Sequence, residues 1–167
     1  MTAERKSVCC FSGHRASKLP WGENESDPRC AALKEELART LESLYESGVR
    51  HFICGMALGS DMYFAEAVLA LRDLHGDVTL EAAIPCPEQT ERWSDGQKRR
   101  YEGILSRCDA RTVISHRYTL DCMDRRNRYM IERSATLVTV YGGGRGGTFN
   151  TIRHALREGL RLIELEV

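Results

Sequence analysis

The sequence predicts a single α/β domain with a Rossmann-like, three-layer fold, in which helices cover both faces of a mostly parallel sheet of about six strands. Short apolar runs alternate with amphipathic segments along the chain, and each parallel crossover requires a helix. Glycine-rich loops follow three of the predicted strands, at the edge where such sheets bind ligands. A length of 167 residues suits one domain, so residues 1–167 are assigned to it.

The first half of the chain supplies three predicted strands and two helices. Apolar runs predict strands at 7–11, 51–54 and 78–84. Asp27 followed by Pro28 is typical of a helix start, and the face that then forms up to Gly48 consists of Leu33, Leu37, Leu41 and Leu44. An alanine-rich segment at about 61–74 predicts the second helix.

The second half continues the alternation. We expect strands at 111–115, 136–141 and 160–165, with a polar segment carrying Trp93 before the first of them. Within the segment 119–133, one helical stripe contains Leu120, Met123, Asn127, Met130 and Ile131. A last helix ends at Gly159 and has on one face Thr148, Ile152, Ala155 and Leu156.

The composition limits the classes of partner. Lys plus Arg and Asp plus Glu both number 24, so no net charge favours sequence-independent binding of nucleic acid. The seven cysteines show no CxxC spacing, which disfavours a zinc or disulfide site and is typical of reduced thiols in a cytoplasmic protein. No stretch approaches roughly 18 apolar residues, so we expect no membrane association.

The three glycine-rich loops are the main candidates for ligand binding. Gly13 follows the first predicted strand and Gly55 and Gly59 follow the second; after the fifth come Gly143, Gly144, Gly146, Gly147 and Thr148. Glycine allows the backbone to approach a phosphate closely, and free N–H groups at the next helix favour an anion. A tight turn would explain any one loop, but three at one sheet edge favour a phosphate site. No Gly-Lys-Ser/Thr triplet occurs, which disfavours a Walker-type ATPase.

Polar side chains in the first two loops are candidate ligand contacts. Arg15 could pair with a phosphate and His14 could donate a hydrogen bond, although either could equally be a solvated loop residue. Asp61 follows the second glycine loop. Its carboxylate either caps the next helix or contacts a ribose or another part of a substrate.

Three further candidates lie outside the glycine loops. Asn127 falls on the apolar stripe of its helix, so its amide is expected to brace a neighbouring loop or to contact a ligand. Arg126 lies at the edge of that stripe and could reach the crevice. Trp93 either stacks on a base or packs in the core.

With these residues in view, the chain resembles the YpsA-like branch of the SLOG superfamily, Rossmann-like proteins related to the DNA-processing protein DprA and to LOG phosphoribohydrolases. The similarity spans nearly the whole chain. The segments that carry it are Phe11-Ser-Gly-His-Arg15 with Lys18-Leu19, Gly55-Met-Ala-Leu-Gly-Ser-Asp61 with Ala65-Glu66, Ser115-His116-Arg117, Arg126-Asn-Arg-Tyr-Met130, and Gly146-Gly-Thr148 with Ala155.

The resemblance implies a site for nucleotides or nucleotide derivatives such as ADP-ribose or NAD, with no required cofactor, and self-association as a homodimer. LOG enzymes rely on a Pro-Gly-Gly-x-Gly-Thr-x-x-Glu motif, whose glutamate would fall at Thr151. LOG-type phosphoribohydrolase activity is therefore disfavoured. The second glycine loop is similar to that of DprA, which binds single-stranded DNA, but the chain has no extended basic groove with several aromatics.

The leading hypothesis is binding or sensing of a phosphate-bearing, nucleotide-derived small molecule, and the YpsA resemblance suggests a regulatory role in stress response or cell division. One alternative is hydrolysis of an N-glycosidic or phosphate bond in such a ligand. Its candidate general bases are Asp61, Glu66 and His14, none of which has a partner that singles it out. The other alternative is DprA-like binding of single-stranded DNA.

Overall fold

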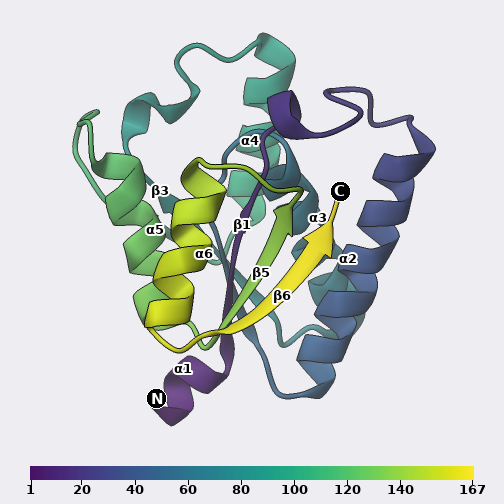
Figure 1. Cartoon of the computed structure of the whole chain (residues 1–167), viewed down its shortest axis with the longest axis vertical. Coiled ribbons are helices and arrows are strands. Elements are labelled where there is room, and N and C mark those ends of the chain that lie inside the picture. Colours follow the sequence, from purple (N-terminus) through teal and green to yellow (C-terminus); the bar gives the residue numbers. More distant parts are fainter.

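A six-stranded sheet, parallel throughout, runs through the molecule (Figure 1). The computed structural model describes residues 1–167. In chain order the strands are β1 (Val8–Gly13), β2 (His51–Cys54), β3 (Thr79–Ile84), β4 (Ala110–Val113), β5 (Thr136–Tyr141) and β6 (Arg161–Glu166). Their order across the sheet is β4-β3-β2-β1-β5-β6. The predicted α/β, Rossmann-like fold is confirmed.

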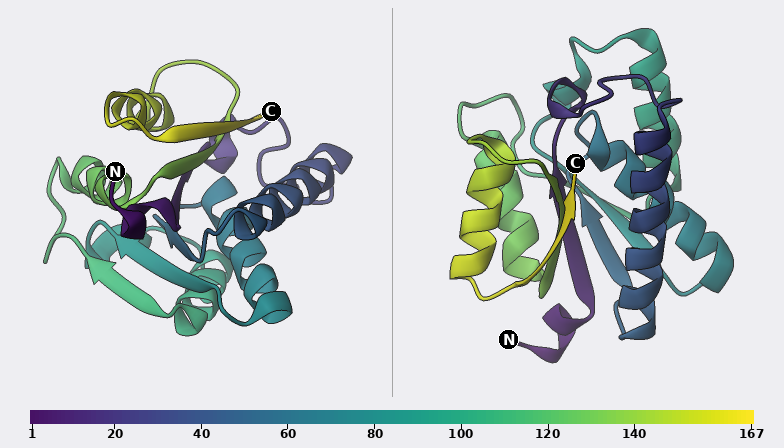
Figure 2. Two further views of the ribbon diagram at one scale, coloured as in Figure 1. Left: turned by 90° about the horizontal axis from the view of Figure 1, so that it is seen from below. Right: turned by 45° about the vertical axis from the view of Figure 1, so that its right-hand side comes forward.

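Helices cover the sheet on both faces. They are α1 (Ala3–Lys6), α2 (Pro28–Glu46), α3 (Ser60–His75), α4 (Asp95–Arg107), α5 (Cys122–Arg133) and α6 (Gly147–Arg157), with short 3₁₀ turns η1 (Ala16–Lys18) and η2 (Pro87–Thr90). Figure 2 shows α5 and α6 on one side of the sheet and α2, α3 and α4 on the other. None of these helices combines the length and the apolar character that crossing a bilayer requires.

The order of the strands explains this division of the helices. The chain builds the sheet outward from β1 to β4 and then returns to place β5 beside β1. Because parallel crossovers are right-handed, reversing the direction of travel moves the connecting helices to the opposite face. The chain therefore leaves the adjacent carboxyl ends of β1 and β5 toward opposite faces, which creates the crevice where ligands of such folds bind.

The strands bury side chains on both faces. In β1, Cys9 and Phe11 join the larger core under α2, α3 and α4, whereas Val8 and Cys10 join the smaller core under α5 and α6. A parallel sheet covered twice has no solvent-facing side, so its strands read as continuous apolar runs. This is why Val-Cys-Cys-Phe is recognisable as a strand although apolar and polar residues do not alternate in it.

The helix starts and faces match the sequence analysis in part. The Asp27 carboxylate accepts a hydrogen bond from the Arg29 N–H at 2.8 Å and caps α2, as predicted. Leu120, however, is 97% exposed, because α5 begins only at Cys122 and the helical period does not reach it. Leu156 is also exposed, in the last turn of α6, where Ile152 and Ala155 make the buried contacts. The prediction that Leu120 belongs to the helical stripe is wrong, whereas Leu156 does lie in the predicted last helix.

Candidate functional site

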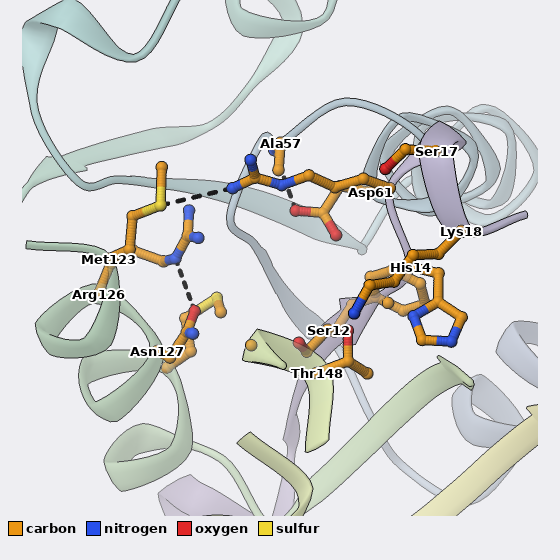
Figure 3. Close-up of a pocket in the computed structure, with 15 residues that line it drawn as sticks. Ser12, His14, Ser17, Lys18, Ala57, Asp61, Met123, Arg126, Asn127 and Thr148 are labelled. Atoms are coloured by element: carbon orange, nitrogen blue, oxygen red, sulfur yellow. Dashed lines mark hydrogen bonds between the residues drawn. The ribbon is translucent and has the colours of Figure 1, made fainter. Parts of the chain in front are cut away.

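A cavity of about 350 Å³ opens at the carboxyl ends of the strands, beside β1. Its wall is formed by the end of β1 with the turn after it, the loop before α3, one face of α5 and the first turn of α6 (Figure 3). The chain reversal between β1 and β5 brings these four segments together. The cavity thus collects residues from across the sequence at the predicted edge of the sheet.

The first turn of α6 presents backbone donors to the cavity. Gly147 and Thr148 line it, and the N-cap residue Gly146 has no side chain with which to cap the helix. The first N–H groups of a helix have no partner within the helix, and the helix dipole adds partial positive charge there. This end of α6 is therefore suited to an anion.

Arg126 forms a buried cationic wall of the cavity. Only 5% of this residue is exposed. Its Nη1 donates to the Gly55 carbonyl at 2.5 Å, and its Nε donates to Asn127 Oδ1 at 2.8 Å. Burial lowers its pKa, while the charge of Asp61 acts in the opposite direction, and a guanidinium remains protonated at neutral pH. Asn127 thus orients the arginine, and both residues line the cavity.

Gly55 and Gly59 serve packing within the protein. A Cβ at Gly55 would lie 2.6 Å from Arg126 Nη1 and 2.8 Å from its Cζ, so a side chain there would displace the guanidinium. Gly59 has φ +88°, and a Cβ there would lie 2.6 Å from the Ala16 backbone nitrogen. Both glycines allow close approach of protein groups, and neither lines the cavity.

Asp61 is the carboxylate of the site. It is 5% exposed, and its Oδ2 accepts a hydrogen bond from the Ala57 N–H at 3.0 Å. The carboxylate therefore holds the loop before α3 and does not cap the helix, which has Gly59 as its N-cap residue and no side-chain cap hydrogen bond. Burial raises the pKa of Asp61 to about 6, against the opposing effects of Arg126, the Ala57 N–H and Arg15.

His14 holds the last glycine loop through a side-chain hydrogen bond. The residue is 4% exposed, and its Nε2 accepts a hydrogen bond from the Gly142 N–H at 3.0 Å. Burial, together with nearby Lys18, lowers its pKa and favours the neutral ring that can accept this bond. Its ring lies 5.3 Å from that of Tyr141. One ring nitrogen is thus engaged with the protein, whereas the buried Nδ1 has no hydrogen-bond partner, and His14 also contributes to the cavity wall.

Two exposed cations complete the rim. Arg15 lines the cavity, and its Nη2 lies 3.4 Å from the Met123 sulfur. Lys18 also lines it and donates to the Arg145 carbonyl of the glycine loop at 3.1 Å. Sequence reasoning did not single out Lys18 as a site residue. The available signal was its spacing of three from Arg15, which one 3₁₀ turn places on the same side.

Other predicted site residues lie outside this cavity. Trp93 packs edge-on against Tyr101, with ring centroids 5.5 Å apart, and borders the core. Gly143 and Gly144 are exposed, with φ of +101° and +88°, in the loop that leads to α6. Of the predicted residues, the structure gathers around the cavity Gly13, His14, Arg15, Asp61, Arg126, Asn127, Gly147 and Thr148. No three His, Cys, Asp or Glu side chains form a group that could hold a metal ion.

Comparison with solved structures supports the fold. DNA processing protein A from Helicobacter pylori, described for its single-stranded DNA binding mode, aligns with a TM-score of 0.64 and 14% identity over 96% of this chain and 65% of that chain. The DprA protein of Streptococcus pneumoniae gives 0.52 and 13% over 93% of this chain and 58% of that one. At sequence identities this low, the similarity is evidence for a shared fold alone.

Sequence comparison places the chain in a family. The UPF0398 protein of Bacillus pumilus is 30% identical over 119 residues, which cover 70% of this chain and 64% of that protein. The SPbeta prophage-derived protein YoqJ of Bacillus subtilis is 30% identical over 142 residues, covering 77% of this chain and 83% of that protein. The YpsA family model, described as "YspA SLOG family", matches residues 9–159. Because that match takes in most of the chain, this protein belongs to the YpsA family of SLOG proteins.

Proposed function

We propose that the cavity beside β1 binds the phosphate of a nucleotide-derived small molecule. The observation that carries this proposal is the convergence of three cations with the uncapped start of α6. Arg15, Lys18 and Arg126 reach the cavity from two different segments, and Gly147 and Thr148 add backbone donors. Charged donors and a helix N-terminus are the groups that proteins use to hold phosphate.

The size and charge of the cavity fit a small phosphorylated compound. Its volume of about 350 Å³ lies near the lower end of the ~300–1,000 Å³ typical of small-molecule pockets. One lining carboxylate, Asp61, opposes three lining cations, which leaves a positive balance. This supports a mononucleotide-sized group within the cavity, with any second nucleotide half lying outside it. The proposal that this binding serves a regulatory role, in stress response or cell division, rests on the family resemblance.

Thermal unfolding against a ligand panel tests the proposal. The panel contains inorganic phosphate, AMP, NAD and ADP-ribose. A ligand at about 100 times its dissociation constant stabilises the folded state by roughly 2.7 kcal/mol, which raises the midpoint by about 5–10 °C for a chain of this size. Absence of any shift across the panel, at concentrations up to the millimolar range, would contradict the proposal.

Arg15→Ala locates the binding in this cavity. Loss of a hydrogen bond to a charged group costs about 1.5–3 kcal/mol, so we expect affinity for a phosphate ligand to fall by tenfold or more. Arg128→Ala is the matched control, because Arg128 is an exposed arginine of α5 that pairs with Asp124 and does not line the cavity. Equal affinities of the two variants would place the phosphate elsewhere.

Chromatography of the bound compound after incubation separates binding from hydrolysis. The LOG-type glutamate position holds Thr151, whose hydroxyl donates to the Gly147 carbonyl at 2.9 Å and which does not line the cavity. We therefore expect the ligand to be recovered intact. Release of a free base or of phosphate would instead support the hydrolase alternative.

A further inference from the structure

Asp61 stands out as an unpaired buried carboxylate within an anion-binding cavity. Its Oδ2 is held by the Ala57 N–H, and no hydrogen bond within the protein reaches Oδ1. No Lys, Arg or His nitrogen lies within 4.0 Å of either oxygen. The neighbouring guanidinium of Arg126 donates instead to Gly55 and Asn127. Figure 3 shows the Asp61 carboxylate and the Arg126 guanidinium directed toward the same space.

The fold itself does not require a charge at this position. The Ala57 N–H needs only one acceptor oxygen, which an amide side chain of the same shape would supply equally well. The buried Asp61 carboxylate destabilises the folded chain, because its loss of hydration outweighs the attraction of the neighbouring Arg126 and Arg15 charges. The second oxygen is therefore available to a group that enters the cavity.

The chemistry of that group is restricted by the carboxylate. An ionised Asp accepts hydrogen bonds and donates none, and phosphate at neutral pH likewise brings mainly acceptor oxygens and negative charge. Asp61 thus disfavours a bare phosphate in the cavity. A ligand gains from Asp61 only if it carries hydrogen-bond donors beside its phosphate.

The rest of the lining identifies hydroxyl groups as the suitable donors. Ser12, Ser17, Thr148 and Asn127 also line the cavity, and their side chains can both donate and accept hydrogen bonds. Such a lining complements the hydroxyls of a sugar, which also donate and accept. The phosphate-binding groups and Asp61 share one small cavity, so the hydroxyls must lie next to the phosphate within one compound.

We propose that Asp61 is a specificity-determining residue that selects sugar phosphates with free hydroxyls, either alone or as the sugar of a nucleotide, and rejects inorganic phosphate. This inference rests on the proposed binding of phosphate in the same cavity. It gives a physical reason for a carboxylate among three cations. It also explains how an anion site avoids being filled by the inorganic phosphate present in any cell.

Isothermal titration calorimetry at pH 7.5 tests the proposal with two probes, inorganic phosphate and ribose 5-phosphate. We expect the unchanged protein to bind ribose 5-phosphate at least tenfold more tightly than phosphate. In Asp61→Asn, the affinity for ribose 5-phosphate should fall about tenfold or more, the range for loss of a hydrogen bond to a charged group. The affinity for inorganic phosphate should rise, because the repelling charge is gone.

This opposite response of the two probes is the deciding result. Affinities that change in the same direction, or not at all, would overturn the role of Asp61 while leaving phosphate binding intact. No binding of either probe to the unchanged protein or to the variant would overturn the proposed function and this inference together. Asp124→Asn is the control, since Asp124 lies on the exposed side of α5 and outside the cavity.

A second measurement needs no variant and distinguishes the two sources of the sugar. Competition against the unchanged protein compares AMP, 2′,3′-dideoxy-AMP and ribose 5-phosphate. Loss of affinity by tenfold or more on removing both hydroxyls supports the proposal, and equal binding of AMP and its dideoxy form refutes it for nucleotides. AMP binding more tightly than ribose 5-phosphate identifies a nucleotide, and the reverse order identifies a free sugar phosphate.

Discussion

We expect the buried carboxylate of Asp61, which lines the cavity, to lower the stability of the folded protein. The pKa of an unfolded Asp is near 3.9, whereas burial raises that of Asp61 to about 6. The folded state therefore holds the proton more tightly, and stability falls as the pH rises from about 4 to 6. Above that window the penalty is complete, on the order of 2–3 kcal/mol at about 1.4 kcal/mol per unit.

Asp61→Asn should remove this penalty while retaining the hydrogen bond to Ala57. We expect its unfolding midpoint at pH 7.5 to exceed that of the unchanged protein by about 5–10 °C. At pH 3, where Asp61 is protonated in the folded state and largely protonated in the unfolded state, the two midpoints should nearly coincide. Calorimetric melts at both pH values check this, and a variant that is less stable at pH 7.5 would show that the carboxylate has a structural partner.

Gly55 shows how a residue outside the cavity shapes it. An added Cβ would meet the Arg126 guanidinium at 2.6 and 2.8 Å. We expect Gly55→Ala to displace Arg126, to destabilise the fold by about 1–3 kcal/mol as overpacking does, and to weaken phosphate binding. Denaturant titration and calorimetry measure the two effects.

Gly103→Ala is the matched control for Gly55→Ala. Gly103 lies in the exposed interior of α4, with open space around its Cα. Alanine there should stabilise the protein by up to about 1 kcal/mol, because it favours the helix, without changing ligand affinity. If both glycine variants bound ligand normally, Arg126 would have no role in the site.

At the scale of elements, the sequence predicts most of the framework but fewer of the functional contacts. The strand at 136–141 and the Asp27 cap are predicted correctly because local pattern determines them. The short helix α1 and the late start of α5 are missed, since a helix of four residues and a turn through Leu120 carry no periodic signal.

For the candidate site, too, the sequence predicts one part and not another: the location of the cavity but not the geometry of its residues. Glycine loops at the strand ends predict where the cavity lies, because topology brings those ends together. The burial of Arg126 and the contact of His14 with Gly142 depend on tertiary partners 71 and 128 positions away. Neither pairing is encoded in local spacing, so the sequence could name these residues but not their geometry.

A polar cluster at the opposite end of the sheet joins three strands to α5. Glu81 of β3 accepts hydrogen bonds from His51 at 2.8 Å, Tyr129 at 2.6 Å and Thr112 at 2.8 Å. Burial alone would raise the pKa of Glu81, but these donors outweigh it and hold the pKa at about 2. Since the unfolded value is near 4.3, the cluster stabilises the protein above about pH 4.5 and loses that contribution as the pH falls toward 2.

Tyr129→Phe tests the energetic role of this cluster. Removal of one donor to a buried carboxylate should cost about 1–3 kcal/mol at pH 7. The cost should shrink only as the pH falls toward 2, where Glu81 becomes protonated in the folded protein. Denaturant unfolding at pH 7 and pH 2 checks both values, and a loss that is equal at both would assign the effect to packing of the ring. Ligand affinity should not change, because the cluster lies away from the cavity.

At the scale of the whole molecule, net charge and topology favour one small ligand over a polymer. The chain has no net charge, and three of its cations, Arg15, Lys18 and Arg126, line the cavity beside β1. The only aromatic residue lining the cavity is Phe11, whose side chain is buried in the core. Proteins that bind single strands combine a basic groove with exposed aromatic stacking surfaces, and the lining of this cavity has no such stacking surface.

Salt dependence separates the two classes of ligand. A single strand that contacts Z phosphates loses affinity with a slope of about −0.7Z against log salt, whereas a compact ligand held in a cavity responds only through screening. We expect oligothymidylate to bind no more tightly than the ~10⁻⁴–10⁻⁶ M typical of non-specific binding at physiological salt. The affinity for ribose 5-phosphate should fall only slightly with added salt. Arg15→Ala should lower the affinity for ribose 5-phosphate more than it lowers the affinity for the oligonucleotide. Nanomolar oligonucleotide binding with a steep slope, displaced by ribose 5-phosphate, would instead assign the cavity to nucleic acid.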